Sequence, residues 1–217
     1  MIRLIPLAAI LLCAATALNS GCSSVYYGTL EKFGLDKRDI LVDRVEEARE
    51  QQADTRDQFR NTLDAFKNLS DFDGGELEDR YDLLKSRYDD SVDEAESVSD
   101  RINSVEKVAR DLFNEWETEL NQISDPELRG ESSRLKRETQ NRYDSMIAAM
   151  RRAESKMPPV LTKFNDHVLF LKHNLNARAI SSLESQLTSV ETDVDALIVD
   201  MEKSIAEADS FLADIGA

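Results

Sequence analysis

A seven-residue repeat between Leu77 and Ile123 constrains the fold of this chain more than any other feature. Apolar residues that recur every three and four positions lie on one face of an α-helix, and a sustained repeat is typical of a coiled-coil seam. Twelve of its fourteen positions are apolar or aromatic, which favours a folded helix over a disordered, charge-rich chain. The fourteen positions are Leu77, Leu84, Ser91, Val98, Val105, Leu112 and Glu119 with Tyr81, Tyr88, Ala95, Ile102, Ala109, Trp116 and Ile123.

Three further segments show a helical repeat. The one over residues 37–69 is weaker, because Gln52, Thr55 and Thr62 interrupt its apolar positions Leu41, Val45, Ala48, Phe59, Phe66 and Leu69. A third repeat, whose register slips once, follows Leu128, Leu135, Tyr143, Met146, Met150, Ala153, Met157, Leu161, Phe164, Val168, Leu171 and Leu175. The fourth is strong, with nine apolar positions of ten, at Leu183, Val190, Leu197, Ser204 and Phe211 with Leu187, Val194, Met201, Ala208 and Ile215.

Turn residues lie between these segments. The DFDGG stretch at residues 71–75 offers two glycines to end the first helix. Asp125 followed by Pro126 is an N-cap with a first-turn proline. Ser181 and Glu184 have the spacing of a capping box, so we expect the fourth helix to begin there. The signals around residues 174–181 are weak, and they leave open whether the third and fourth helices are continuous.

The lengths of the segments predict an all-α fold, an elongated antiparallel helical bundle with a long coiled-coil hairpin over residues about 73–175. The first and fourth helices are shorter and cover only part of the hairpin, so residues about 109–139 should project beyond the four-helix body. Pro158 and Pro159 lie inside the third helix, where we expect a kink and no domain boundary.

Charge supports the same arrangement. Residues 71–123 carry a net charge of −11 and residues 181–217 a net charge of −8, whereas residues 125–180 carry +4. Because like-charged neighbours along whole helices would repel one another, the basic third helix should lie between the two acidic ones. The second and fourth helices then lie on a diagonal of the bundle.

The N-terminus has the pattern of a secretion signal. Arg3 and the free amino group precede an apolar run at residues 4–18, which is shorter than the roughly 20 residues of a membrane span. Small residues then lead to Cys22, in a pattern that resembles a bacterial lipobox, although Leu18 stands four residues before the cysteine instead of three. We therefore expect a signal peptide at 1–21, an acylated tether at 22–35 with palmitate on Cys22, and a single helical domain at 36–217.

The expected location of the protein and its expected partners follow from this lipid anchor. By resemblance to Gram-negative lipoproteins, the absence of Asp after Cys22 favours the periplasmic face of the outer membrane, with the lipid anchor as the contact with the membrane. Removal of the signal takes Cys13 and Arg3 with it and leaves 26 basic against 43 acidic side chains, a net charge of −17. Such a surface repels nucleic acid, so no nucleic-acid partner is expected.

Three stretches resemble those of an uncharacterised Gram-negative bacterial lipoprotein family, catalogued only as a domain of unknown function. They are KRDILVDRVEEARE at 37–50, FDGGELEDRYD at 72–82 and VLFLKHNLNARAI at 168–180. The resemblance covers nearly all of the chain after the signal. It implies a mostly helical envelope protein, and it implies no activity and no catalytic residue.

Chemistry-bearing motifs are sparse. The sequence has no Gly-rich phosphate loop, Ser-His-Asp set or nucleophile elbow. His167 and His173 are six residues apart, which places them on different faces of a helix, unlike zinc ligands at i and i+4. We therefore expect no enzyme, cofactor or metal, and an enzyme that uses the His167 and His173 region is the least favoured alternative.

The favoured function is a non-enzymatic interaction or scaffold protein of the cell envelope with an unidentified envelope partner. The alternative is a self-assembling coiled-coil spacer, which leaves a homo-oligomer open. The candidate interaction patch combines Trp116, which fits the seam and is expected to be core, with the densest basic cluster of the chain. We expect this cluster either to contact membrane phosphates or an acidic partner, or to neutralise the acidic second helix. Its members are Arg129, Arg134, Lys136, Arg137 and Arg142.

Overall fold

The computed structural model describes residues 36–68, 77–174 and 177–215, without the side chains of 177–181, 184 and 185. By its contacts the chain divides into two units, Met1–Ile40 and Leu41–Ala217. In the first unit, the side chain of Asp36 accepts a hydrogen bond of 3.0 Å from the backbone N–H of Asp39 and caps the helix that begins there.

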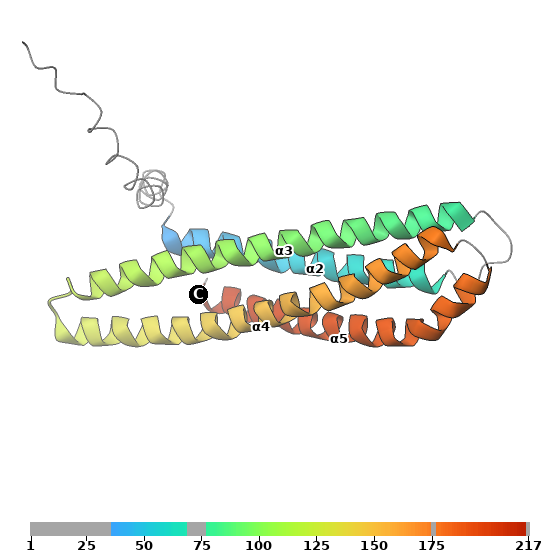
Figure 1. The fold of residues 1–217 in the computed structure, drawn as a ribbon. Coiled ribbons are helices and arrows are strands. Elements are labelled where there is room, and N and C mark those ends of the chain that lie inside the picture. The colour runs from blue at the N-terminus through green and yellow to red at the C-terminus, as the bar shows by residue number, and fades with distance from the viewer. Residues whose placement is uncertain (1–35, 69–76, 175–176, 216–217) are drawn as a thin grey trace, which may run out of the picture. The chain divides into compact units, whose positions relative to one another are not determined.

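Four helices make up the described chain, which contains no strand (Figure 1). They are α2 (Lys37–Lys67), α3 (Leu77–Leu120), α4 (Pro126–His173) and α5 (Ala177–Ile215). The predicted all-α bundle with a long antiparallel hairpin is confirmed, with α3 and α4 as the arms of the hairpin. Because α4 ends at His173 and α5 begins at Ala177, the third and fourth helices are separate.

Within the second unit, the helices are arranged as the charge pattern predicts. Successive helices are neighbours, and α5 returns to lie beside α2, while the rings of Phe66 on α2 and Phe164 on α4 stack at 5.1 Å across the core. The two acidic helices, α3 and α5, therefore occupy the other diagonal. Each neighbouring pair is joined by an ion pair: Glu47–Arg101, Glu106–Arg151, Lys156–Asp200 and Arg60–Glu202.

The core follows the predicted seams closely in α5, where nine of the ten positions are buried and Leu187 is half-buried. In α2 the polar seam residues are buried too, and their hydrogen bonds explain why they are tolerated. The hydroxyl of Thr62 lies 2.8 Å from that of Ser91, and the side-chain oxygen of Gln52 accepts a bond of 2.6 Å from Ser204. A buried polar group costs little when it has such a partner.

The predicted seam of α3 is wrong toward the hairpin turn. There Phe113 and Leu120 are buried, whereas Leu112 is half-buried and Glu119 is exposed. An α-helix has 3.6 residues per turn, so its buried stripe drifts by about 20° per heptad relative to a strict seven-residue repeat. The stripe has moved by one residue after several heptads.

The sequence predicts N-caps for the third and fourth helices, and only the first of these two caps is confirmed. Asp125 caps α4 as expected: its carboxylate accepts hydrogen bonds from the backbone N–H of Glu127 at 2.8 Å and of Leu128 at 3.1 Å. The capping box at Ser181 and Glu184 is wrong, because both residues lie inside α5. At the other end of α4, the backbone N–H of Asn174 bonds to the carbonyl of Leu171 and closes the helix.

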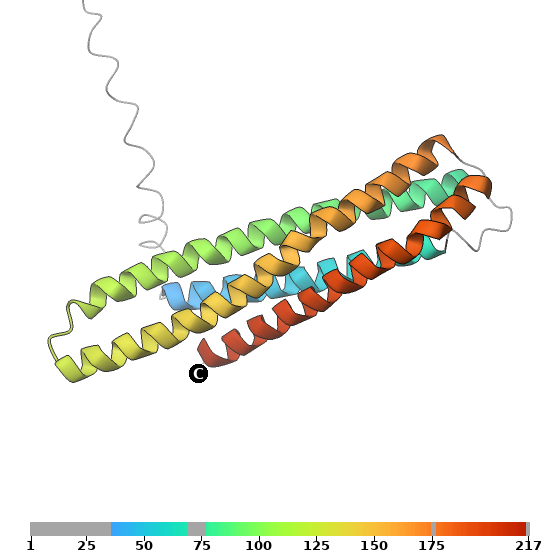
Figure 2. The same cartoon turned by 60° about the horizontal axis from the view of Figure 1, so that its bottom comes forward.

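α4 runs without a break through Pro158 and Pro159 (Figure 2). A proline inside a helix removes one backbone hydrogen bond to the preceding turn. The hydroxyl of Thr162 donates to the carbonyl of Pro158 at 2.9 Å and ties the next turn to this point.

Candidate functional site: the hairpin tip and the α2–α3 groove

The hairpin tip, defined here as residues 112–138, is the part of α3 and α4 that extends past α5. The C-terminal end of α5 stops well before the α3–α4 turn in both ribbon views (Figures 1 and 2). There Arg142 of α4 lies 3.2 Å from Asp214, and Thr139, Asp214 and Ile215 line one small hollow. The tip therefore begins where α5 ends.

Aromatic rings connect the tip to the body. Tyr143 of α4 lies between Phe113 of α3, at 5.6 Å between ring centroids, and Phe211 of α5, at 6.4 Å. Burial raises the pKa of the Tyr143 hydroxyl to about 12. Trp116 is half-buried, and its indole N–H donates a 2.9 Å hydrogen bond to the hydroxyl of Ser132, so it joins the two arms of the hairpin.

The cations of the predicted patch are mostly engaged with neighbouring side chains. Arg134 pairs with Glu131 at 2.5 Å and Glu138 at 2.7 Å, and these two carboxylates raise the pKa of its guanidinium further. Lys136 reaches across to Glu117 of α3 at 2.5 Å. The remaining contacts are those of Arg137 with Ser133 and of Arg142 with Asp214.

These pairings give the cluster an internal role. It neutralises acids of α3, α4 and α5, while Arg129 is exposed and has no ion pair among the described residues. The structure does not bring these cations together into one open basic surface.

Leu128 and Leu135 are the feature of the tip that sequence reasoning misplaced. Both were expected in the buried seam of α4, yet their exposed fractions are 64% and 43%. They lie fourteen and seven residues before Arg142, on the row of α4 that faces α5 in the body. Further along this row, Lys156 pairs with Asp200 and Lys163 with Asp193. α5 ends level with Arg142, one heptad short of Leu135 and two heptads short of Leu128.

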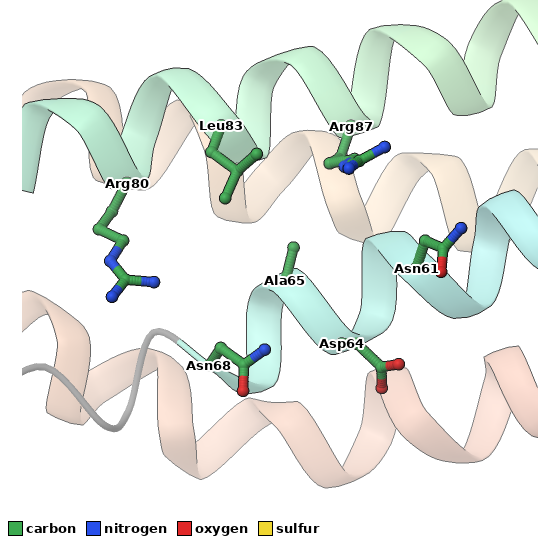
Figure 3. Close-up of a pocket in the computed structure, with 7 residues that line it drawn as sticks. All are labelled: Asn61, Asp64, Ala65, Asn68, Arg80, Leu83 and Arg87. Carbon is green, nitrogen blue, oxygen red and sulfur yellow. The ribbon is translucent and has the colours of Figure 1, made fainter.

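A second hollow lies between α2 and α3, in the part of the second unit far from the tip (Figure 3). We call it the α2–α3 groove; its volume is about 290 Å³. One wall is made by Arg80, Leu83 and Arg87 of α3. The other wall is made by Asn61, Asp64, Ala65 and Asn68 of α2.

Each wall of the groove has a polar side chain at both ends and an apolar side chain in the middle. In Figure 3, Arg80 lies across from Asn68 at one end, Leu83 across from Ala65 in the middle, and Arg87 near Asn61 at the other end. Leu83 is 42% exposed. Polar donors thus stand at both ends of a small apolar floor. Asp64 also lines the groove, and in Figure 3 its side chain points away from α3.

The backbone beside the groove is held firmly. The carbonyl oxygen of Arg87 accepts hydrogen bonds from Gln58 at 3.1 Å and from Thr62 at 3.1 Å, both on α2. Among the described residues, neither Arg80 nor Arg87 forms an ion pair through its guanidinium. Sequence reasoning missed this groove, because its two walls are separate in the chain and each alone shows only ordinary surface residues.

The two histidines separate as their spacing predicts. His167 is buried, with its ring 5.5 Å from that of Phe66 in an edge-on contact, and burial lowers the pKa of its imidazole. His173 is exposed. The pair therefore cannot converge on one substrate or metal ion.

Other kinds of site are not found in the described ranges. They contain no group of three or more His, Cys, Asp or Glu side chains placed to hold a metal ion. None of the helices α2 to α5 has a stretch long and apolar enough to cross a bilayer. Cys22, the predicted acylation site, lies outside the described residues, as does the turn expected at residues 71–75.

Comparisons with known proteins place the chain in a family without assigning it a role. A search among curated proteins gives no match. The sequence profile of one family, described as "Protein of unknown function (DUF2959)", matches residues 26–215, which is most of the chain and includes all four helices. This chain therefore belongs to the DUF2959 family of proteins of unknown function.

Proposed function

We propose that this protein is a non-enzymatic lipoprotein of the outer membrane that acts as a scaffold in the cell envelope. Its anchor is an acylated Cys22 at the periplasmic face, and its helical bundle docks a helix of an envelope protein at the hairpin tip. The signal-like N-terminus supports the anchor. The observation that carries the docking role is the exposed row of Leu128 and Leu135.

The chemistry of the body indicates what would cover this row. Along α4 the same row runs beside α5, an amphipathic helix whose Asp193, Asp200 and Asp214 pair with the cations of this row, Lys163, Lys156 and Arg142. A partner helix with an apolar stripe and an acidic flank would continue α5 past Ile215. It would cover the two leucines and bring carboxylates near Arg129, whose guanidinium has no ion pair among the described residues.

The anchor is tested by metabolic labelling with a fatty acid. Label should appear on the wild-type protein and not on Cys22→Ser, because the thiol is the acceptor of the first acyl chain. The variant should also keep its N-terminal segment. Absence of label from the wild-type protein would rule out the lipoprotein assignment.

The docking role is tested by placing a photo-crosslinking amino acid at Leu135 in the full chain in cells. We expect one discrete adduct whose partner peptide is an amphipathic helix rich in Asp and Glu. The matched control places the crosslinker at Val199, which is 59% exposed on α5 in the body. In a second arm, Leu128→Glu should remove the adduct at Leu135, while Val199→Glu should not.

Two other results would contradict this role. Adducts of equal yield at Leu135 and Val199 would show that the tip is ordinary surface. An adduct between two copies of the chain, together with concentration-dependent oligomers in sedimentation, would favour the self-assembling spacer instead.

A further inference from the structure

We propose that the α2–α3 groove is a second recognition site, separate from the tip, and that it binds a peptide segment of a partner protein with two carboxylates flanking an apolar side chain. The proposal goes beyond the docking of a helix at the tip and does not depend on it. It rests on the paired chemistry of the two groove walls.

The carboxylates are assigned to the arginines. Arg80 and Arg87 line the same groove, and neither guanidinium forms an ion pair with a described residue. Arg101 of the same helix, in contrast, pairs with Glu47 of α2. A guanidinium offers several N–H donors in a planar fork that matches a carboxylate. In a chain with a net charge of −16, the groove thus presents two cations that have no ion pair with a described residue.

The spacing fixes how far apart the two carboxylates are. Residues seven apart on a helix are separated by about 10 Å along its axis, since each residue rises by about 1.5 Å. A polyproline-II peptide spans a similar length in three residues, at about 3.1 Å each, and it makes one turn in those three residues. Acidic side chains three positions apart in a polyproline-II segment lie on one face and therefore meet Arg80 and Arg87 together.

The opposite wall suits the backbone of such a segment. Asn61 and Asn68 are also seven residues apart, and each amide offers both donors and an acceptor. These groups can bond to the main-chain N–H and C=O groups of a polyproline-II peptide, which makes no internal hydrogen bonds. Between them, Leu83 and Ala65 form an apolar floor that accepts one aliphatic side chain.

The walls are fixed before any ligand binds. Bonds from Gln58 and Thr62 hold the backbone of α3 at Arg87, and the hydroxyl of Thr62 also meets that of Ser91. A preformed site loses little conformational freedom on binding, which favours recognition of a short segment.

The experiment uses the full chain in detergent and measures binding of a fluorescent, end-blocked peptide, Glu-Leu-Ala-Glu, by anisotropy. We expect saturable binding that weakens with salt. Arg80→Gln with Arg87→Gln should weaken it at least tenfold. The matched control is Lys107→Gln with Arg110→Gln, two exposed cations of the same helix outside the groove, whose removal changes net charge equally. This control should bind as the wild type does.

Further arms identify the ligand and protect against a folding defect. Leu83→Ser leaves both arginines in place and should still weaken binding, and the amide peptide Gln-Leu-Ala-Gln should bind less tightly than the acidic one. Melting temperatures of all variants should match that of the wild type, because the changed side chains are at the surface or half-buried. No saturable binding, equal loss in the groove and control variants, or displacement by inorganic phosphate at equal concentration would each overturn the peptide site.

Discussion

His167 shows how one residue can link the fold to pH. Its imidazole is buried beside Phe66, and its Nδ1 atom has no hydrogen-bond partner among the described residues. Burial is the largest influence on the pKa of this imidazole, and it lowers that pKa. The nearby charge of Lys163 lowers it further, whereas Gln186 and Asp166 act to raise it. The folded state therefore keeps His167 neutral at pH values where an unfolded chain binds a proton.

The sign of the pH effect follows from this difference. Above the unfolded pKa of about 6.5, both states are neutral and His167 has no effect on stability. As the pH falls below that value, the unfolded state gains protons first, so the free energy of unfolding should decrease. We expect the melting temperature to fall between pH 7 and 5.5, and His167→Phe to reduce this fall. His173→Gln, at the exposed histidine, is the control and should retain the wild-type slope. Equal slopes for all three proteins would show that His167 does not titrate in this range.

At the scale of single helices, Asp125 is the side chain that starts α4. Its carboxylate satisfies two backbone N–H groups that have no partner inside the helix, and it lies near the positive end of the helix dipole. Asp125→Ala should lower stability by about 1 kcal/mol.

The measurement is thermal unfolding, combined with hydrogen exchange of the first turns of α4 in case only the tip opens. Asp125→Asn is the matched variant, because asparagine caps helices about as well as aspartate. It should lie close to the wild type. If Asp125→Asn lost as much stability as Asp125→Ala, the effect would be due to the charge of Asp125 and not to capping.

The four helices could be predicted from sequence because each carries a seam of its own. α5 illustrates this best, since its apolar repeat is dense and its polar exception, Ser204, bonds to Gln52. The start of α5 could not be predicted, because the capping-box residues Ser181 and Glu184 are compatible with a helix interior as well as with an end. Likewise, the shift from Leu112 to Phe113 depends on how tightly the helices coil, which the repeat alone does not specify.

The candidate sites were harder to predict than the helices. Trp116 and the basic cluster were found from composition, but their partners Ser132 and Glu117 became visible only when the two arms were paired. Leu128 and Leu135 have the spacing of core residues, and their exposure depends on where α5 ends. Seam periodicity reports which face of a helix is apolar and cannot report whether another helix reaches it.

At the scale of the second unit, the hairpin tip and the body differ in how much surrounds them. In the body, residues such as Met150 and Phe164 are fully buried among several helices. At the tip, each arm has the other arm beside it, and the apolar Leu128 and Leu135 remain exposed. Fewer buried contacts lower the free energy needed for local opening.

Hydrogen exchange should reveal this difference directly. We expect backbone amides of residues 112–138 to exchange at least tenfold faster than those of residues 143–168, because the tip can open without disturbing the body. Mass spectrometry of peptides from the two segments of α4 provides an internal control within one helix. Equal protection in purified protein would indicate that something covers the tip, and a second copy would then be the first candidate.

The polar contacts of α2 have a consequence for how the bundle assembles. If α2 slid by one heptad, Gln52 would take the place of Phe59 against Phe164, and the buried Val45 would take the place of Gln52 against the hydroxyl of Ser204. Thr55 and Thr62 are seven residues apart, so the slide would put Thr55 in the place of Thr62. The threonines alone would therefore not prevent it. The displaced amide and the abandoned hydroxyl would each be buried without a partner, at about 1–3 kcal/mol apiece. Misaligned docking of α2 is therefore weak enough to reverse, and the helix can release and dock again until its one alignment is found.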